Sequence, residues 1–574
     1  MLPSALPSVL TSLWRAAPVA QCCPVTPAPE TSRWGALVGV VLALLLLAPL
    51  LGPGFVLVRD MVFVPEQPLT RSLLGVDGVP RAVPSDLVVA LASRLVPAAW
   101  LQDLVLVAVV VGGAWGAARL APTTSRAGCL AAATAYGWSA YLHERLLLGH
   151  WALLVGWAVL PWAARAALAW RAGGSGWPAV LCLAVAALGG ASAGLLVGLV
   201  VVVCGRPVLA AGATAVLALP WAVPALLLPG GVPAGDPEGV AAFASRSDTP
   251  FGVLGSLLTG GGVWAEAAVP PGRAAGSVAA LLVLGLAVAG LPRLVQRLGR
   301  RLPVAGGVAL GLALLGALPG TAYLLRLGVE HLPAAGLLRD GQKWLAPLVL
   351  LVAAAAACGT EAVAERLAGT RTRRLAAALA VLAPLAALPG AAWGEGGRLQ
   401  RSEYPEDWAA VTAQVSADRV AVLPWRLYRA FPWNGDRTVL DPAPRWLSAR
   451  AVVDDDLPLS TGSVRGEDPL AAELDAAATS GRPLRAALAA AGVGQVLVER
   501  TDRGADEERL LRQVSGLRLV VATPELALYD VPGALRPSTD RAVWPAVLAH
   551  AAALGLALAA LVGTLRSRDQ RPES

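Results

Sequence analysis

A carboxylate follows the first long apolar segment of the chain. Residues 35–57 are almost wholly apolar, and Val58, Arg59 and Asp60 come directly after them. About 20 apolar residues suffice to cross the hydrocarbon core, so this run predicts a membrane-spanning helix. Asp60 should then lie at the outer membrane surface, where a carboxylate can face a lipid headgroup and water together. The alternative is a plain interfacial anchor, because charges are common at the ends of spans.

A second acid and two histidines lie around a tight turn between two apolar segments. His143 and Glu144 are adjacent in this turn, and His150 follows about a turn into the next segment. A carboxylate beside an imidazole can bind a divalent cation such as Mg²⁺ or Mn²⁺, or hold a metal-bound phosphate. The spacing matches no recognised metal motif, and a surface pair of Glu144 with Arg145 is the alternative.

Two basic residues lie four positions apart where another apolar segment begins. Arg339 and Lys343 belong to the run from Gly336 to Trp344, and Lys343 is the only lysine of the chain. Residues four apart share a helix face, where these two side chains could clamp a phosphate or pyrophosphate. The alternative is a pair whose charged ends snorkel to the lipid headgroups.

Three tryptophans in polar regions are candidates for contact with an acceptor. Trp264 belongs to a Gly- and Pro-rich loop that we interpret as a lid or an acceptor groove, and Trp425 and Trp433 flank a run of aromatic and basic residues. Aromatic rings offer flat apolar faces that can stack on sugar rings. A domain core or a surface that docks onto the membrane uses the same residue types, so both interpretations stay open.

The composition indicates which elements must position these residues. Of 574 residues, 56% are hydrophobic and only 15% are charged, whereas soluble domains carry about 25% charged residues. The chain is therefore expected to be a polytopic membrane protein. Its net charge of +7 comes mainly from arginines beside apolar segments, where membrane topology requires them, so it does not indicate binding to nucleic acid.

The apolar segments predict about 12 transmembrane helices, with both termini cytoplasmic. Arginine clusters near 293–301, 366–374 and 566–571 mark cytoplasmic connections. This assignment requires 178–205, which is interrupted at Gly189 and Gly190, to cross twice. The predicted spans lie at 35–57, 99–120, 128–142, 147–170, 178–205 (two), 207–229, 275–296, 303–325, 344–365, 375–394 and 543–565.

Four regions follow from this topology. Residues 1–33 form a cytoplasmic tail rich in Pro and Ala, and 34–394 form the membrane domain. Residues 395–540 form a small extracytoplasmic α/β domain, and 541–574 form the last helix and its tail. The membrane domain has large external loops at 59–98, 230–274 and 326–343.

The polar regions also predict individual elements. Ser85 or Asp86 should cap a short interfacial helix. In 395–540, alternating patterns predict strands at 419–423, 495–499, 517–522 and 525–530, and helices at 405–415, 482–491 and 506–513.

Several chemistries are absent from the sequence. It contains no Walker phosphate loop, no dinucleotide-binding fingerprint on a strand–helix turn, no G-x-S-x-G nucleophile elbow and no paired C-x-x-C, because the one G-x-S-x-G string, Gly190–Gly194, lies inside the apolar segment 178–205. These signs argue against an ATP-driven pump. No predicted cytoplasmic segment is large enough to form the catalytic domain of an enzyme that uses nucleotide sugars.

The overall pattern resembles the GT-C superfamily of integral-membrane glycosyltransferases. The resemblance rests on the many spans, on Asp60 just after the first span, and on Glu144 in the next small external loop. A late loop ending at Arg339–Lys343 and the extracytoplasmic region 395–540 complete it. The chain departs from the family in having Asp60 without a second acid beside it, which puts metal dependence in doubt.

The resemblance implies transfer of a sugar from a polyprenyl-phosphate donor to a cell-envelope glycan, lipid or protein. The protein would lie in a bacterial plasma membrane, in contact with its lipids. Asp60 would act as general base on the acceptor hydroxyl, and Arg339 and Lys343 would hold the donor phosphate.

Two alternatives belong to other functional classes. A catalytically inactive relative could keep the fold as a scaffold or assembly factor, since fold alone does not specify activity. A transporter of lipid-linked glycans would need ionisable residues deep within its spans. Asp103 is the best candidate for such a residue, but it lies only a few positions into its span.

Overall fold

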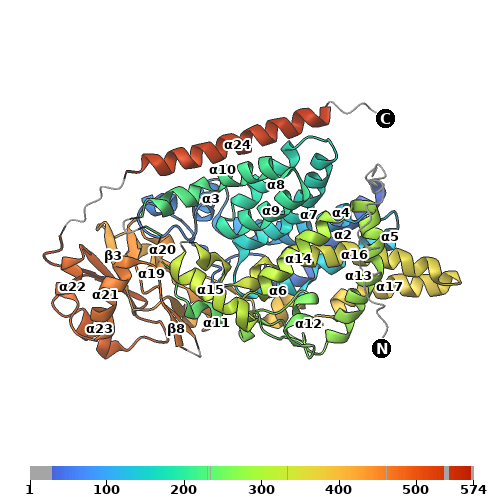
Figure 1. Cartoon of the computed structure of the whole chain (residues 1–574). Helices are drawn as coiled ribbons and strands as arrows, with labels where there is room; N and C mark the ends of the chain where they lie inside the picture. Colours follow the sequence, from blue (N-terminus) through green and yellow to red (C-terminus); the bar gives the residue numbers. More distant parts are fainter. Residues whose placement is uncertain are drawn as a thin grey trace, which may run out of the picture.

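The computed structural model describes residues 29–569 apart from 229–230, 233, 333, 460–461 and 536–541. Residues 1–28 of the predicted tail lie outside this range. A bundle of long helices makes up most of the molecule, and a region built around a β-sheet lies at one end of it (Figure 1).

Among the described residues, seven helices are long and apolar enough to cross a membrane. They extend close to the predicted spans, because each is an uninterrupted apolar run of about 20 residues or more. They are α2 (Pro29–Leu47), α4 (Ala98–Leu120), α7 (Trp151–Arg171), α10 (Pro207–Leu226), α13 (Ser277–Leu298), α16 (Ala346–Arg366) and α24 (Trp544–Asp569).

The segment 178–205 forms two helices, α8 (Trp177–Ala187) and α9 (Ala191–Cys204). Gly190, the residue directly before α9, has a φ of +88°, which L side chains rarely adopt, so the chain turns between the two helices at a glycine. Both helices are shorter than the 20 residues that an untilted span needs. The interruption of the segment is confirmed, and the total of twelve crossings stays a prediction.

Two predicted spans differ from the structure. The predicted span 303–325 is divided into α14 (Arg301–Leu314) and α15 (Pro319–His331), which meet at 80°. Pro319 forces Leu318 into an extended conformation, so one straight helix cannot continue through this point. The predicted span 128–142 ends early, because α5 (Arg126–Gly137) stops at Gly137.

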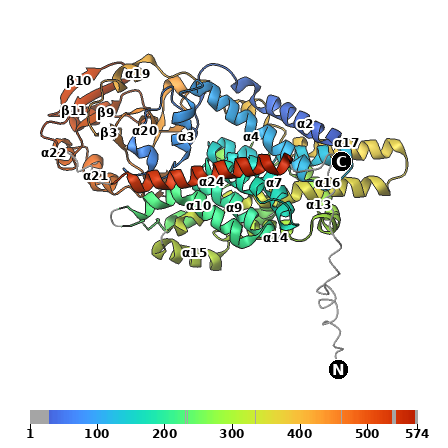
Figure 2. The ribbon, with the colours of Figure 1, turned by 90° about the horizontal axis from the view of Figure 1, so that it is seen from above.

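Three further helices lie around the long helices: α3 (Ser85–Ala92), α6 (Ala140–Leu147) and α17 (Thr370–Ala386). The short helix α6 follows α5 after an extended residue at Ser139. Helix α3 lies where the interfacial helix was expected, but it follows Pro84 and no side chain caps it, so the predicted cap at Ser85 or Asp86 is wrong. Helix α17 overlaps the predicted span 375–394 but ends at Ala386. Figure 2 shows α24 lying along the bundle, where it packs against α10 and α8.

A five-stranded mixed sheet forms the core of the C-terminal region. Its strand order is β10-β11-β9-β3-β6, in which β3 is parallel to both neighbours and β11 is antiparallel to both of its own. The strands are β3 (Arg419–Leu423), β6 (Arg450–Val452), β9 (Gln495–Glu499), β10 (Arg518–Ala522) and β11 (Leu526–Asp530). Strands therefore lie at all four predicted positions.

The helices of this region also lie at their predicted positions. They are α19 (Glu406–Thr412), α22 (Arg485–Ala490) and α23 (Glu507–Gln513), and α21 (Pro469–Thr479) is an additional helix. The helices α21, α22 and α23 each pack one face on the sheet, through apolar residues such as Leu474, Leu488 and Leu510 respectively. The pattern of apolar residues is sufficient to predict these helices and strands, because each of them contributes one apolar side to a small local core.

Backbone hydrogen bonds attach the C-terminal region to the first loop after α2. Strand β1 (Phe55–Val56) pairs antiparallel with β2 (Arg401–Ser402). Three residues further on, the Arg59 N–H donates to the Thr438 carbonyl at 2.7 Å, and the Leu440 N–H donates to the Arg59 carbonyl at 2.8 Å. Strand β5 (Thr438–Leu440) thus fixes the chain immediately before Asp60.

Candidate functional site

A cavity of about 470 Å³ lies between the helical bundle and the C-terminal region. Segments far apart in the chain contribute to it: the first loop, the turn after α6, the loop 230–274 and the loop before α16. The hairpin of β4 (Tyr428–Ala430) with β5 and the strand β7 (Leu457–Leu459), which pairs with β8 (Gly462–Val464), complete the wall. The side chains that carry charge, a titratable proton or an aromatic ring are Arg59, Asp60, His150, Phe243, Trp264, Glu266, Arg339, Asp340, Lys343 and Tyr428. Its volume lies within the range of about 300–1,000 Å³ usual for small-molecule sites.

The backbone around Asp60 is held in one conformation from two sides. Arg59 has a φ of +43°, which L residues rarely adopt, and its peptide groups are bonded to β5. On the other side, the Asp60 N–H donates to the Leu148 carbonyl at 3.2 Å. Gly149 packs so closely on this turn that a Cβ would overlap backbone atoms of Val58 and Met61. These contacts place the Asp60 side chain on the cavity wall.

The Asp60 carboxylate has a neighbour at each oxygen. The Tyr428 hydroxyl, from β4 (Tyr428–Ala430), donates to Oδ1 at 2.6 Å. The His150 Nε2 atom lies 3.2 Å from Oδ2. Burial alone would raise the pKa of Asp60, but the hydrogen bonds from His150 and Tyr428 and the charge of Arg445 outweigh burial and hold this pKa below its ordinary value. Asp60 is therefore a carboxylate at neutral pH.

The opposite part of the wall carries positive charge. Arg339 Nη2 contacts Glu467 at 3.2 Å, whereas Arg339 Nη1 is buried without a hydrogen-bond partner. Among the described residues the Lys343 ammonium has no hydrogen-bond or ion-pair partner, and it lies 5.5 Å from the centre of the Trp344 ring. Buried polar atoms are normally satisfied, so these nitrogens are available to an anionic ligand.

The predicted helix face for Arg339 and Lys343 is wrong in detail. Arg339 follows the 3₁₀ turn η4 (Ala335–Leu338), whereas Lys343 belongs to the next 3₁₀ turn, η5 (Gly341–Leu345), and Arg339 and Asp340 lie at the break between the two turns. Both side chains nevertheless line the same cavity. Asp340 between them accepts two hydrogen bonds from Arg145, at 2.5 and 2.9 Å, so its negative charge is already compensated.

Glu144 lies behind the cavity, in a buried polar network. Gln342 Nε2 donates to Glu144 Oε2 at 2.8 Å, and the Glu144 carboxyl group is hydrogen-bonded to Asp248. Burial and the nearby charge of Asp248 raise the pKa of Glu144 well above its ordinary value. Because Glu144 and Arg145 are both fully buried, the alternative of a surface pair between them is wrong.

Asp248 is the ionised member of this carboxyl pair. Burial raises its pKa, but its hydrogen bond with Glu144 and the charge of Arg273 outweigh burial, and the net pKa lies below the ordinary value. Arg273 Nε lies 3.3 Å from Asp248 Oδ2, and the Gly262 N–H donates to the same oxygen at 2.9 Å. This pair ties the loop 230–274 to α6.

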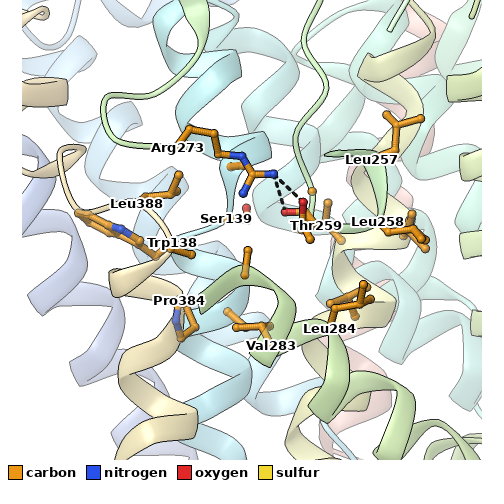
Figure 3. A pocket seen from close by; sticks show the side chains of 18 residues that line it. Trp138, Ser139, Leu257, Leu258, Thr259, Arg273, Val283, Leu284, Pro384 and Leu388 are labelled. Carbon is orange, nitrogen blue, oxygen red and sulfur yellow. Dashed lines mark hydrogen bonds between the residues drawn. The ribbon is translucent and has the colours of Figure 1, made fainter. Parts of the chain in front are cut away.

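A second, much smaller cavity of about 40 Å³ lies on the far side of the network. It is mainly apolar and lies between α5, α13, α16, α17 and the helix α12 (Gly252–Leu258). Figure 3 shows Arg273 extending toward Thr259, to which it donates at 2.7 Å. The volume admits only a few water molecules, so Arg273 acts here as a structural link.

His143 does not share a site with Glu144. Its Nδ1 atom lies 2.5 Å from Glu395 Oε1, and both side chains are fully buried. Glu395 belongs to a turn in which four successive residues from Trp393 to Gly396 have positive φ. Within the ranges that the structure describes, no group of three or more His, Cys, Asp or Glu side chains could hold a metal ion. The described residues therefore offer no cluster of three protein ligands for a divalent cation, and His143 and Glu144 do not form the predicted pair.

The three candidate tryptophans lie in different environments. Trp264 lines the cavity and packs edge-on against Phe243, with 4.9 Å between ring centres. Trp433 stacks on Phe431 at 4.9 Å within the aromatic core of the C-terminal region. Trp425 packs against the apolar cluster under the sheet. Trp425 and Trp433 do not line the cavity, so the core interpretation applies to them.

Sequence reasoning missed three cavity residues: Tyr428, Asp340 and Glu266. Asp340 lies in the run from Gly336 to Trp344, and Tyr428 lies in the aromatic and basic run between Trp425 and Trp433. Neither spacing nor residue type distinguishes these two residues from their neighbours. Tyr428 lies 368 residues after Asp60, so only the tertiary structure connects them. Glu266 is an exposed carboxylate of η3 (Glu266–Ala268) with no sequence signal.

Two of the sequence comparisons find nothing similar. No protein-family model matches the chain, and no curated protein matches its sequence.

The comparison of structures finds a mycobacterial membrane glycosyltransferase. The chain is similar to the cryo-EM structure of the arabinofuranosyltransferase AftD from mycobacteria, with a TM-score of 0.54 and 18% identity. The match covers 87% of this chain but only 40% of that one, so this chain spans about two fifths of the length of AftD. A structure of an AftD mutant matches with a TM-score of 0.49 and 17% identity. The likeness to AftD shows a shared fold with a glycosyltransferase, in agreement with the predicted resemblance, and the seven long apolar helices of the described residues support a multi-pass membrane protein.

Proposed function

We propose that this chain is a membrane glycosyltransferase that moves a sugar from a polyprenyl-phosphate donor to a cell-envelope acceptor, with Asp60 as general base. One observation carries the proposal: a single cavity has an ionised carboxylate on one wall and unpartnered basic nitrogens on another. The fold supports the same reaction class, because the similar structure is that of an arabinofuranosyltransferase.

The proposed reaction needs a base and a positively charged phosphate site, and the cavity offers both. Asp60 would remove the proton from an acceptor hydroxyl as the hydroxyl oxygen attacks the anomeric carbon. The bond from that carbon to the phosphate oxygen breaks, its electron pair stays on the phosphate, and the configuration at the anomeric carbon inverts. Arg339 and Lys343 would stabilise the charge that develops on the leaving phosphate.

The aromatic and acidic side chains nearby suit a sugar. Trp264 and Phe243 offer apolar ring faces, and Glu266 offers a carboxylate that can accept hydrogen bonds from sugar hydroxyls. Since no side-chain cluster in the described residues fits a metal ion, no step through a metal is part of the proposal. The two basic side chains supply the positive charge instead.

The proposed orientation follows from the donor chemistry and the arginine clusters. A polyprenyl tail partitions between apolar helices, and its phosphate stays at the membrane surface. We place the cavity and residues 395–540 on the outer face of a bacterial plasma membrane, with both termini in the cytoplasm.

The test is transfer by the purified chain in nanodiscs with a panel of polyprenyl-phosphate sugars and envelope acceptors. Asp60→Asn should abolish transfer. Asp77→Asn is the matched control, because Asp77 lies in the same loop but pairs with Arg71 at 3.2 Å, outside the cavity. Both variants must keep the melting behaviour of the wild type.

The outcomes separate the competing functions. Transfer that survives in Asp60→Asn would remove Asp60 from the role of base while leaving a transferase. A well-folded wild type that neither transfers sugar nor hydrolyses any donor of the panel would contradict the proposal and favour a non-catalytic assembly factor.

A further inference from the structure

His150 lies between two charged groups at the edge of the cavity. Its Nε2 atom is 3.2 Å from Asp60 Oδ2, and its Nδ1 atom is 3.1 Å from Arg145 Nη1. The histidine follows Gly149, whose close packing on the turn at 58–61 fixes the start of α7 beside Asp60. Both ring nitrogens therefore have a defined neighbour.

The contact with Arg145 determines which nitrogen of His150 carries the proton. A guanidinium group has only donors and keeps its protons in proteins, so Nδ1 must accept the hydrogen bond. In a neutral imidazole with an accepting Nδ1, the proton lies on Nε2. Nε2 is the nitrogen that faces Asp60, and it can donate to the carboxylate there.

Arg145 is itself held in place. Its side chain is fully buried, Asp340 accepts two hydrogen bonds from it, and Gln342 accepts a third. Since these contacts fix the guanidinium plane, Nη1 is presented to His150 in one orientation. An ordered chain of contacts thus runs from Asp340 through Arg145 and His150 to Asp60.

We infer that His150 is a positioning residue for the proposed base: it donates from Nε2 to Asp60, and Arg145 selects the tautomer that can do so. Together with Tyr428 on the other oxygen, His150 fixes the rotation of the carboxylate and leaves its remaining lone pairs to the acceptor hydroxyl. The role in catalysis rests on the proposed function, whereas the tautomer can be measured without any substrate.

Several other charged groups surround His150 and contribute to its environment. Arg145 and Asp340 contact each other beside it, and the remaining groups line the same cavity. The charged and titratable groups that face it are Arg59, Asp60, Arg145, Glu266, Arg339, Asp340, Lys343 and Tyr428.

Nitrogen-15 NMR of the protein in nanodiscs tests the tautomer. The chain has only four histidines, so selective labelling gives few signals, and His150→Gln identifies the signal of interest. We expect a neutral ring protonated at Nε2 at pH 7. Arg145→Lys, which keeps a charge for Asp340 but removes the planar donor, should change this signal. A ring protonated at Nδ1, or at both nitrogens, would overturn the inference.

Two substitutions of His150 test its role in transfer. A glutamine places its amide nitrogen near the position of Nε2, whereas an asparagine places it near Nδ1. His150→Gln should therefore keep kcat within about threefold of wild type, and His150→Asn should lower it by about 10- to 100-fold, the usual loss for a hydrogen bond to a charged group. The KM for the donor should change little in either variant, because the phosphate is bound elsewhere.

The pH profile distinguishes positioning from a general loss of structure. Without a donor at Oδ2 the pKa of Asp60 rises, so the acidic limb of kcat/KM should move to higher pH in His150→Asn but not in His150→Gln. Equal kcat values and equal limbs for both variants and the wild type would contradict the inference. If no donor is active in any variant, the proposed function fails, and the NMR result still decides the tautomer.

Discussion

Replacing Glu144 by glutamine should make the folded protein more stable than the wild type, and this difference in stability should grow as the pH rises. Glu144 is completely buried, and burial and the charge of Asp248 raise its pKa well above the ordinary value of 4.5. The protonated carboxyl group donates to Asp248 and accepts from Gln342. A glutamine has the same shape and can make both hydrogen bonds without a titrating proton.

The magnitude follows from proton linkage. Above pH 4.5 the unfolded chain releases the Glu144 proton, whereas the folded chain keeps it until its raised pKa is reached. A raised carboxyl pKa therefore costs stability as pH increases, by about 1.4 kcal/mol for each pH unit in this window. Glu144→Gln removes this loss, so its stability relative to wild type should increase with pH at about the same rate.

Thermal unfolding in detergent, followed by tryptophan fluorescence between pH 5 and pH 8, measures the difference in stability between the wild type and Glu144→Gln. Asp248→Asn is the contrasting variant: Asp248 stays ionised, and its loss leaves the buried Arg273 without its partner. It should lose about 3–5 kcal/mol throughout this pH range. Glu508→Gln, at an exposed helix pair with Arg512, should change stability by less than about 0.5 kcal/mol.

The reasoning would be refuted by a parallel pH dependence of wild type and Glu144→Gln. That result would mean that Glu144 is ionised in the folded state. A loss of stability in Glu144→Gln as large as in Asp248→Asn would equally contradict a neutral carboxyl group at this position.

Three further predictions concern the cavity. Tyr428→Phe removes a donor from Asp60, so the acidic limb of kcat/KM should move to higher pH; Tyr404→Phe, which loses only a 3.0 Å bond to a backbone carbonyl, should leave the limb unchanged. Lys343→Met should raise the KM for the donor by about tenfold or more, as expected for a charged phosphate contact, while Arg326→Met at an exposed pair should not. Transfer should persist in the presence of a chelator, because the described residues offer no metal site, and loss of activity that only Mg²⁺ or Mn²⁺ restores would contradict this prediction.

The pattern of residue types along the chain predicted those elements that depend mainly on residues close together in the sequence. Strand β9 occupies the residues expected from a run of Val and Leu, and the interruption at Gly190 follows from a backbone conformation that favours glycine. The bend before Pro319 was missed, because the apolar composition continues through it. Proline disfavours the helical conformation of the residue before it, whatever the hydropathy of the segment. Greater weight on this rule would have predicted the bend between α14 and α15.

The site was predictable only in part, because the cavity is made by tertiary contacts. Asp60, Arg339 and Lys343 were found from residue type and position beside apolar segments, and the fold brings them to one cavity. Glu144 has the same sequence signal but lies behind the wall, since its neighbours Asp248 and Gln342 bury it. Nothing distinguishes Tyr428 from the other residues of its aromatic and basic run, because its importance arises from a contact across 368 residues.

The pairing of the first loop with β5 has a consequence for biogenesis. Asp60 leaves the ribosome early, whereas Tyr428, which bonds to its carboxylate, is added 368 residues later. At about 5–20 residues per second, synthesis of the intervening chain takes roughly 20–70 s. During that time the backbone of Arg59 lacks its partners in Thr438 and Leu440, so the proposed base has no fixed position. The nascent membrane helices can thus meet donor lipids before the chain is able to consume them.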